Sequence, residues 1–272
     1  MRANRFEGRV VFVAGSTGMA ASAARALAAE GATVAVSSRN EEHLRALAAS
    51  VEASGDRFSW HVADLSDEGA VDGAFRACVE RHGRIHALLH VAGISGRRYG
   101  DGPAHEASLE GWEAVMRANA TSTFLTTRAA LRQMLGQEPD AIGQRGAILL
   151  MSSALAQHPS PIHFGTHAYA ASKGAIESFT RAVAGAYAQH GIRVNAIAPS
   201  LVATPMSERA QNDPAIRAYL REKQPLAGGP IEADAVTPVA LHLLSDEARM
   251  ITGQVLSVDA GWSVSEPEQP PP

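Results

Sequence analysis

The feature that most constrains the fold is the alternation of short, continuously apolar runs with longer Ala- and Leu-rich segments of helical period. The apolar runs predict seven strands, at Val10–Ala14, Thr33–Ser37, Phe58–Val62, Ala87–Val91, Ala147–Met151, Arg193–Ala198 and Gln254–Val258. Helices are predicted between them, near residues 19–30, 41–53, 67–82, 108–135, 168–190 and 232–244. Apolar strands joined by crossover helices are typical of a parallel sheet covered on both faces. The sequence therefore predicts an α/β fold with a doubly wound, Rossmann-like, seven-stranded parallel sheet, whose ligands bind beyond the carboxyl ends of the strands.

The length and composition fit one domain with a large core. Of 272 residues, 46% are hydrophobic, and no internal repeat or linker divides the chain, so residues 1–263 are assigned to one domain. Residues 264–272 are Pro-rich and are predicted to be a flexible tail. The net charge of −4 offers no basic surface for nucleic acid, and no apolar run is long enough for a membrane span. The single cysteine and a polar start without a secretory signal favour a cytoplasmic location.

A tyrosine and a lysine one helical turn apart stand out, because lysine is rare in this chain. Of 24 basic residues only Lys173 and Lys223 are lysines, and each follows a tyrosine, Tyr169 or Tyr219, by four positions. Tyr219 and Lys223 lie among charged residues and are interpreted as a solvated surface pair. Tyr169 and Lys173 lie among small residues, downstream of an apolar strand that ends in two serines. That context makes them the better candidates for chemistry.

The ends of the first four predicted strands indicate a dinucleotide site. Gly15-Ser-Thr-Gly18 leads into a helix, where glycines allow close approach to a pyrophosphate; an ordinary tight turn is the alternative. The second strand ends in Ser37-Ser-Arg39 rather than in an acidic residue, which favours a 2′-phosphate and therefore NADP(H) over NAD(H). A plain surface arginine is the alternative for Arg39. Asp64 could accept from an adenine amino group or cap the next helix. Ala92 and Gly93 leave room for a flat ring or sugar.

Taken together, these segments resemble the short-chain dehydrogenase/reductases in their compact single-domain form, over roughly Gly8 to Gly261. The resemblance rests on Tyr169-x-x-x-Lys173, the serine pair before it, Arg193-Val-Asn-Ala-Ile-Ala-Pro199, and the segment from Ile251 to Trp262. It implies a catalytic tetrad of Asn119, Ser153, Tyr169 and Lys173. The expected cofactor site comprises Gly15, Ser16, Thr17, Gly18, Met19, Ser38, Arg39, Asp64, Leu65, Ala92, Gly93, Tyr169, Lys173, Pro199, Val202 and Thr204. Substrate is expected to contact Ser95, Leu155, Phe164 and Met206.

The chain departs from the pattern of that family in several places. Its glycine turn is one residue shorter, and His90-Val91 stands where the family has two asparagines. Ser200 and Ala260 replace glycines of the family pattern. The segment from Ser153 to Tyr169 is about three residues longer than usual. The residue types of the tetrad are intact.

The resemblance implies hydride transfer between a nicotinamide and a carbonyl or secondary alcohol. Such a reaction needs a proton donor for the developing alkoxide, and a free tyrosine is a poor base at neutral pH. The Lys173 ammonium, together with the cationic oxidised nicotinamide, is expected to lower the pKa of Tyr169. Ser153 would hold the carbonyl oxygen. Asn119 would interrupt its helix and hold a water linked to Lys173, the alternative being a helix-interior asparagine bonded to backbone.

Several alternatives stay open. A dinucleotide-binding sensor or scaffold without catalysis is the main one, and an epimerase or dehydratase is disfavoured because no substrate domain follows the sheet. No metal site is expected, although His163 and His167 have ligand spacing. The expected substrate is a medium-sized, mostly apolar carbonyl compound. Residues 136–146 and 201–230 are long connections and candidate lids. The small residues of helix 168–190 suit a homodimer or homotetramer.

Overall fold

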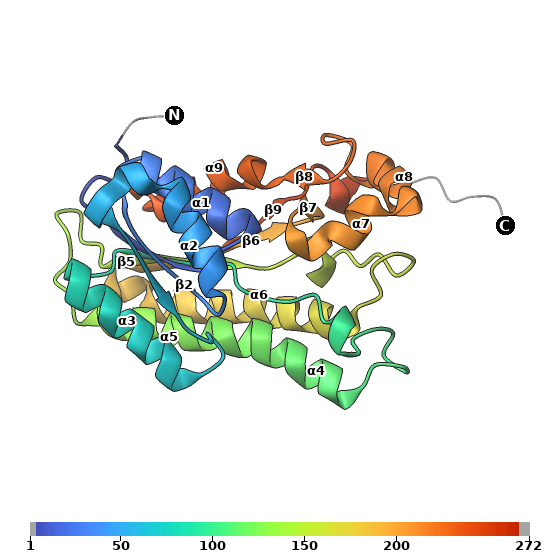
Figure 1. Cartoon of the computed structure of the whole chain (residues 1–272), viewed down its shortest axis with the longest axis horizontal. Helices are drawn as coiled ribbons and strands as arrows, with labels where there is room; N and C mark the ends of the chain where they lie inside the picture. Colours follow the sequence, from blue (N-terminus) through green and yellow to red (C-terminus); the bar gives the residue numbers. More distant parts are fainter. Residues whose placement is uncertain (1–3, 267–272) are drawn as a thin grey trace.

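The structure is a computed structural model that describes residues 4–266, except the side chains of residues 52 and 53. Its centre is a seven-stranded sheet in the order β3-β2-β1-β4-β5-β6-β9, with every neighbouring pair parallel (Figure 1). The strands are β1 (Val10–Ala14), β2 (Thr33–Ser38), β3 (Phe58–Val62), β4 (Ala87–His90), β5 (Gly146–Met151), β6 (Ile192–Pro199) and β9 (Val255–Val258). The predicted doubly wound, Rossmann-like α/β domain is confirmed, and each predicted strand ends within one residue of the observed one.

Helices cover both faces of the sheet, as Figure 1 shows. One face carries α1 (Gly18–Ala29), α2 (Glu41–Ser50) and α9 (Ala233–Leu244), and the other carries α3 (Glu68–His82), α5 (Ser122–Leu135) and α6 (His167–Tyr187). The segment predicted as one helix over 108–135 is interrupted: α4 (Leu109–Val115) passes through a π-helical turn at Met116–Thr121 into α5. A π turn inside a helix frequently marks a functional site, and this one contains Asn119.

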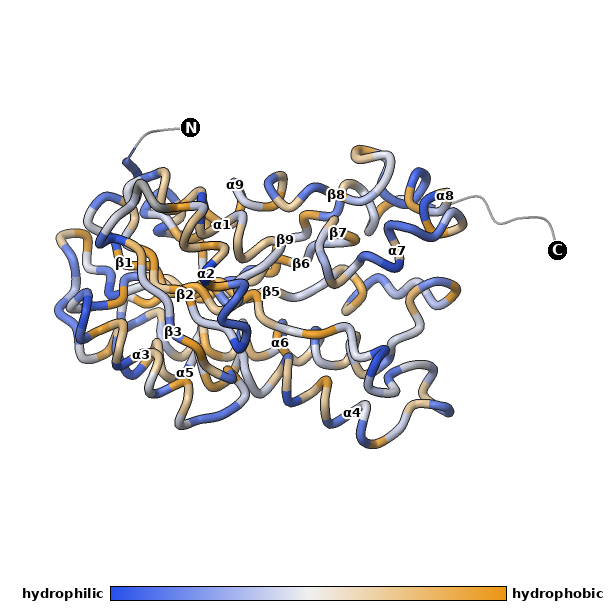
Figure 2. The backbone as a smooth tube through the Cα atoms, viewed as in Figure 1, coloured by the Kyte–Doolittle hydropathy of each residue, from blue (hydrophilic) through white to orange (hydrophobic). Residues whose placement is uncertain are grey.

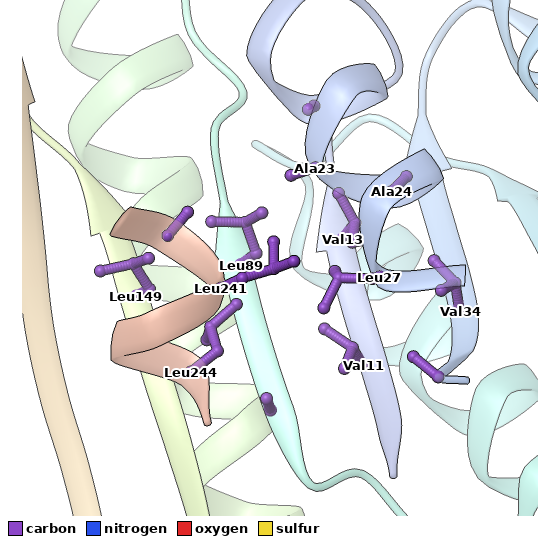
Figure 3. Close-up of a cluster of buried hydrophobic side chains, with 14 of the residues drawn as sticks. Val11, Val13, Ala23, Ala24, Leu27, Val34, Leu89, Leu149, Leu241 and Leu244 are labelled. Carbon is purple, nitrogen blue, oxygen red and sulfur yellow. The ribbon is translucent and has the colours of Figure 1, made fainter. Parts of the chain in front are cut away.

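The core consists of two apolar layers, one on each side of the sheet. Side chains alternate between the faces of a strand, so Val11 and Val13 of β1 face α1 and α9, while Phe12 faces the opposite layer. Figure 3 shows Val11 and Val13 beside Leu27 and Leu241. In the opposite layer Phe12 stacks on Phe75 at a centroid distance of 4.2 Å. Burying each such large side chain contributes about 1.5–3 kcal/mol to stability. In Figure 2 the hydrophobic segments of the backbone tube, drawn in orange, accordingly lie along the strands.

The strand order places a crevice at one edge of the sheet. β1 lies between β2 and β4, so the chain crosses to the other side of β1 after β3, and the order reverses there. Ligands of doubly wound sheets bind at such a switch point, beyond the carboxyl ends of the strands. The segments that follow β1, β4, β5 and β6 all reach this edge, and they carry most of the predicted site residues.

The two long connections lie at opposite edges. Residues 201–230 follow β6 and form β7 (Val202–Ala203), α7 (Glu208–Asn212) and α8 (Pro214–Lys223), and β7 pairs with β8 (Ile231–Glu232). Residues 136–146 instead precede β5. Gln137 accepts from the Ile85 N–H at 2.8 Å, before β4 begins, and Asp140 pairs with Arg9 at 3.0 Å, before β1 begins. This segment therefore lies at the amino ends of the strands, and its prediction as a lid is wrong.

The end of the described chain is ordered by packing. Trp262, which begins a short 3-10 turn that ends at Val264, is 2% exposed. The predicted flexible tail falls mostly on residues 267–272, which lie outside the described residues. Within residues 4–266, no helix combines the length and the apolar character that a membrane span requires.

Candidate active site

The glycine turn after β1 forms the start of α1. Gly15 and Gly18 have φ values of +126° and +53°, in the region that favours glycine. Thr17 is the N-cap residue of α1, but its side chain makes no capping hydrogen bond. A Cβ added to Gly18 would lie 2.8 Å from Cγ2 of Thr204, so the turn packs directly against the segment after β7. A helix N-terminus without a side-chain cap, reached through glycines, fits the pyrophosphate of a dinucleotide.

The ends of β2 and β3 lie beside this turn. Ser38 Oγ is hydrogen-bonded to Ser16 Oγ at 2.8 Å, and Arg39, the next residue, is exposed. Oδ1 of Asp64 accepts from the N–H and the hydroxyl of Ser66, at 2.9 and 2.7 Å. Burial raises the pKa of Asp64, but the two Ser66 hydrogen bonds and the Arg39 and Arg117 charges together lower it. Asp64 therefore presents a carboxylate at this edge.

The helix-cap alternative for Asp64 is excluded by the residue that does cap α3. The N-cap is Asp67, whose Oδ1 accepts from the Ala70 N–H at 2.8 Å. Leu65, the next predicted cofactor residue after Asp64, is 5% exposed and packs into the core. Ala92, after β4, is held by its N–H donating to the Ala14 carbonyl oxygen at 2.9 Å. The cap, the packing of Leu65 and the backbone hydrogen bond of Ala92 fix the loops at the carboxyl ends of β3 and β4.

Tyr169 and Lys173 lie one turn apart on α6, and Ser153 lies at the end of β5. Nζ of Lys173 is 5.6 Å from the centre of the Tyr169 ring and donates to the Met151 carbonyl oxygen at 2.7 Å. The Lys173 side chain is buried, with 4% of the residue exposed. Ser153 is within hydrogen-bonding reach of the Tyr169 phenol, despite the longer segment between them. The loop absorbs its extra residues, and the serine and the tyrosine still meet.

Burial controls the ionisation of both groups. It raises the pKa of Tyr169, and a hydrogen bond from Ser153 opposes this rise. Burial also lowers the pKa of Lys173, to about 8. The two shifts share one cause, because removing water disfavours the phenolate and the ammonium alike. Lys173 donates to the Met151 carbonyl oxygen, and burial outweighs the Ser153 hydrogen bond, so the Tyr169 pKa is raised by the protein's own groups and not lowered as the spacing predicts.

Asn119 lies in the π-helical turn and is fully buried. Its Oδ1 accepts from the Ile94 N–H at 2.8 Å, and its Nδ2 donates to the Ile94 carbonyl oxygen at 3.1 Å and to Ser172 Oγ at 3.0 Å. A Cβ on Gly93 would lie 2.9 Å from Asn119 Oδ1 and 3.8 Å from Lys173 Nζ. The asparagine therefore joins the loop after β4 to α6, right beside the lysine.

Two buried carboxylates that the sequence did not single out hold α6 in place. Asp101, after β4, accepts from the backbone N–H groups of Ala168 and Tyr169 at 3.0 and 2.9 Å. It supplies the N-terminal cap of α6 that Thr166 does not provide. Glu177, one turn after Lys173, accepts from Ser152 Oγ at 2.9 Å and from the Gln157 amide. Both contacts join loops to the helix, so no local pattern signals them.

A cavity of about 520 Å³ opens at this edge of the sheet. Twelve of the predicted residues line it: Met19, Gly93, Ser95, Ser153, Leu155, Phe164, Tyr169, Lys173, Pro199, Val202, Thr204 and Met206. Asn119 is not among the residues that line the cavity. The remaining predicted cofactor residues do not line it either, and lie next to the carboxyl ends of β1 to β4: Gly15, Ser16, Thr17, Gly18, Ser38, Arg39, Asp64, Leu65 and Ala92. The lining also includes Arg97, Arg98, Arg209 and Trp262, which were not among the individually predicted site residues.

The other Tyr-x-x-x-Lys pair is not a solvated surface pair. Tyr219 is half-buried, accepts from Ser160 Oγ at 2.9 Å and packs 5.9 Å from the Trp262 ring. Nζ of Lys223 lies 5.8 Å from the same ring and donates to the Ser265 carbonyl oxygen. The prediction of a surface pair is wrong, because the end of the chain folds back over α8. Both residues stabilise the segment that covers the cavity.

His163 and His167, which have a spacing typical of metal ligands, both contact other groups of the protein. His167 Nδ1 accepts from the Ala104 N–H at 2.9 Å, and the His163 ring packs 4.7 Å from the ring of Tyr219. Across the described part of the chain, no three His, Cys, Asp or Glu side chains gather in a way that could hold a metal ion. These imidazoles are accounted for by packing and by a helix-terminus hydrogen bond.

Known proteins share both the sequence and the fold. Residues 13–263 match a family model described as enoyl-(acyl carrier protein) reductase. The chain is 34% identical over 263 residues to a cyclopentanol dehydrogenase from Comamonas testosteroni, covering 96% of this chain and 99% of that protein. It is 32% identical over 263 residues to a 2,5-dichloro-2,5-cyclohexadiene-1,4-diol dehydrogenase from Sphingobium indicum, with the same coverage. A 3-ketoacyl-(acyl-carrier-protein) reductase from Brucella melitensis, complexed with NADH, has a TM-score of 0.83 at 29% identity, covering 95% of this chain and 99% of that one.

The fold and the site together define a nicotinamide-dinucleotide-dependent oxidoreductase that acts on CH–OH or C=O groups. The chain belongs to the short-chain dehydrogenase/reductase family, in its compact single-domain form.

Proposed function

We propose that the protein is an NADP(H)-dependent enzyme that transfers hydride between nicotinamide and a carbonyl or secondary alcohol, with Tyr169 as general acid and base. The observation that carries the proposal is that Ser153, Tyr169 and Lys173 line one cavity at the carboxyl edge of the sheet. The glycine turn opens at the same edge and packs against Thr204 of the cavity wall. Relatives named as dehydrogenases of a cyclic alcohol and a cyclic diol support the reaction class.

The dinucleotide would be held by the uncapped start of α1, by Asp64 and by the cavity wall from Pro199 to Thr204. Bound there, it supplies or accepts the hydride. Arg39, exposed at the end of β2, is the residue that we assign to the 2′-phosphate. The positive charge of Arg39 helps to lower the pKa of Asp64, which indicates that the guanidinium lies on the same, adenosine side of the crevice as Asp64. NADP(H) is therefore the favoured cofactor.

The protein's groups handle the proton. In reduction, the Tyr169 hydroxyl gives its proton to the substrate oxygen as that oxygen gains charge, and Ser153 Oγ donates a hydrogen bond to the same oxygen. The raised pKa of Tyr169 keeps the phenol protonated at neutral pH, which suits the acid role. In oxidation, Tyr169 accepts the proton from the alcohol. Lys173 holds a positive charge beside the phenol, and Asn119 positions the loop and helix around it. The role of Asn119 in holding a water stays a prediction.

The direct test is absorbance of the reduced nicotinamide with a panel of ketones, run with NADPH and with NADH. Tyr169→Phe is expected to lower turnover by about 10²–10⁴-fold while leaving dinucleotide binding unchanged. Tyr219→Phe is the matched control, because it removes the same atom from the other Tyr-x-x-x-Lys pair, outside the cavity lining. Full activity of the Tyr169 variant would rule out the tyrosine assignment, and equal or better rates with NADH would rule out the role of Arg39.

The same experiments address the alternative of an inactive sensor. A sensor would bind a dinucleotide in a thermal-shift titration but oxidise or reduce nothing in the panel. If neither NADPH nor NADH raises the melting temperature, the enzyme and the sensor hypotheses both fail. The mutual placement of Ser153, Tyr169 and Lys173 favours the enzyme.

We also propose that the protein forms a homo-oligomer, a dimer or a tetramer. α4 and α5 expose large apolar side chains, including Leu109 at 71%, Trp112 at 42% and Phe124 at 43%. Phe124 in turn lies edge-on to Phe179 of α6, at 6.2 Å. Trp262, by contrast, is buried within the chain. Sedimentation velocity measures the state, and a monomer at micromolar concentration would contradict the proposal. Burial raises the pKa of the thiol of Cys78 to about 12, so this thiol is inert.

We also propose a cytoplasmic location, because a single cysteine cannot form an internal disulfide, which suits a reducing compartment.

A further inference from the structure

Three arginines line the cavity and are exposed to solvent, which places them at its opening. Arg97 and Arg98 come from the loop after β4, and Arg209 comes from α7, on the segment that covers the cavity. Nη2 of Arg97 donates to the His163 carbonyl oxygen at 3.1 Å, which restrains its guanidinium. Nη1 of Arg209 lies 4.0 Å from Asp213, but that pair is solvent-exposed and contributes little. Two segments far apart in sequence thus bring like charges to one opening.

Positive charges outnumber negative ones among the residues that line this end of the cavity. Burial lowers the pKa of Arg97, the Arg209 guanidinium lowers it further, and Asp101 raises it. Asp101 already accepts from two backbone N–H groups at the start of α6. Glu208 also lines the cavity, so three arginines and one carboxylate belong to the lining itself, while Asp101 and Asp213 act on Arg97 and Arg209 from outside it. A ligand with a negative charge relieves the repulsion between Arg97 and Arg209.

The cavity changes character from the catalytic end to the mouth. Ser153 and Tyr169 mark the reacting end, and the less exposed part of the lining also holds the apolar side chains of Leu155, Phe164 and Trp262. The three exposed arginines lie at the opening. A molecule that fits this order has a carbonyl at one end, an apolar middle and an anion at the other end.

We propose that the substrate is a carboxylate-bearing carbonyl compound or its alcohol, whose carboxylate binds between Arg97 and Arg209 while its carbonyl faces Tyr169. This inference rests on the proposed function. A guanidinium binds a carboxylate through two parallel hydrogen bonds, and two guanidinium groups that line one cavity from different segments suit one such group. Arg209 lies on the covering segment, so the carboxylate also joins that segment to the loop after β4. The mostly apolar substrate expected from the sequence is thereby narrowed to an oxo acid.

The test compares oxo acids from 4-oxopentanoate to 8-oxononanoate with their methyl esters, using NADPH. At the best chain length, kcat/KM for the acid is expected to exceed that for the ester by at least about tenfold, the effect of about 1.4 kcal/mol. Arg97→Gln with Arg209→Gln is expected to remove this preference while leaving the ester rate and the KM for NADPH within about threefold. At saturating NADPH, added salt is expected to slow the acid more than the ester. Arg217→Gln, on the exposed face of α8, is the matched control.

The outcomes are distinguishable from those that test the proposed function. The proposal is overturned if esters match acids at every length, if the double variant raises the KM for NADPH instead, or if Arg217→Gln has the same effect. If no carbonyl compound is reduced, the proposed function fails, and the proposed carboxylate site is then tested by ligand binding alone. The oxo acid, but not its ester, is then expected to raise the melting temperature of the unchanged protein and not of the double variant; equal shifts would overturn the proposal.

Discussion

Lowering the pH is expected to destabilise the protein through His90. This residue ends β4, and it is 1% exposed. Its Nδ1 lies 2.9 Å from Thr126 Oγ1 and its Nε2 lies 3.3 Å from Ser122 Oγ, both on α5. Burial lowers the pKa of His90 to about 3, the Lys173 charge adds to this shift, and a backbone hydrogen bond with Ala92 opposes it. The native state therefore holds a neutral imidazole.

The size of the effect follows from the difference between the folded and unfolded pKa values. The unfolded chain binds a proton at His90 below pH 6.5, and the folded chain does so only near pH 3. Stability from the neutral imidazole is thus fully present above pH 6.5 and is lost as the pH falls toward 3. Each pH unit in this window costs about 1.4 kcal/mol, so about 2 kcal/mol is lost by pH 5. That loss shifts the midpoint of urea unfolding by about 1 M.

The assay is urea unfolding of the original protein and of His90→Asn, near pH 7.5 and near pH 5. Asparagine does not titrate, and the other ionisable groups are common to both proteins. The difference in stability between them is therefore expected to shift by about 2 kcal/mol in favour of the variant at the lower pH. A difference that stays the same at both pH values would refute the assignment of a neutral, buried His90.

Other changes test the site and its cover. Gly93→Ala places a methyl group against Asn119 Oδ1 at 2.9 Å, so a loss of about 1–3 kcal/mol in urea unfolding is expected; unchanged stability would show that the loop yields. Because the pKa of Lys173 is about 8, the ammonium beside the phenol is lost above that pH and reduction is expected to slow there; a flat profile up to about pH 9.5 would contradict its role. Trp262→Ala removes a buried ring whose Nε1 donates to the His158 carbonyl oxygen at 3.1 Å, so calorimetry should show about 3–5 kcal/mol of destabilisation; a change below about 1 kcal/mol would contradict that packing.

Prediction from the sequence succeeded where the signal is local and failed where segments meet. Strand and helix positions depend on periodicity within a few residues, and all seven strands of the main sheet were found. Tyr219 was assigned to a solvated face because its neighbours in sequence are charged, yet the ring packs on Trp262, which lies far along the chain. The segment at 136–146 was predicted as a lid from its length, although it precedes a strand and therefore lies at the amino edge. Asp101 gave no local signal, since the groups that it caps belong to α6.

The sequence by itself determined the doubly wound sheet, the glycine turn before α1 and the helical spacing of Tyr169 and Lys173, because each depends on neighbours along the chain. Only the tertiary structure decided the ionisation of that pair, since burial is set by the segments packed around it. It also decided that Arg97 and Arg209 line one cavity, because their proximity depends on how the segment after β6 folds relative to the loop after β4.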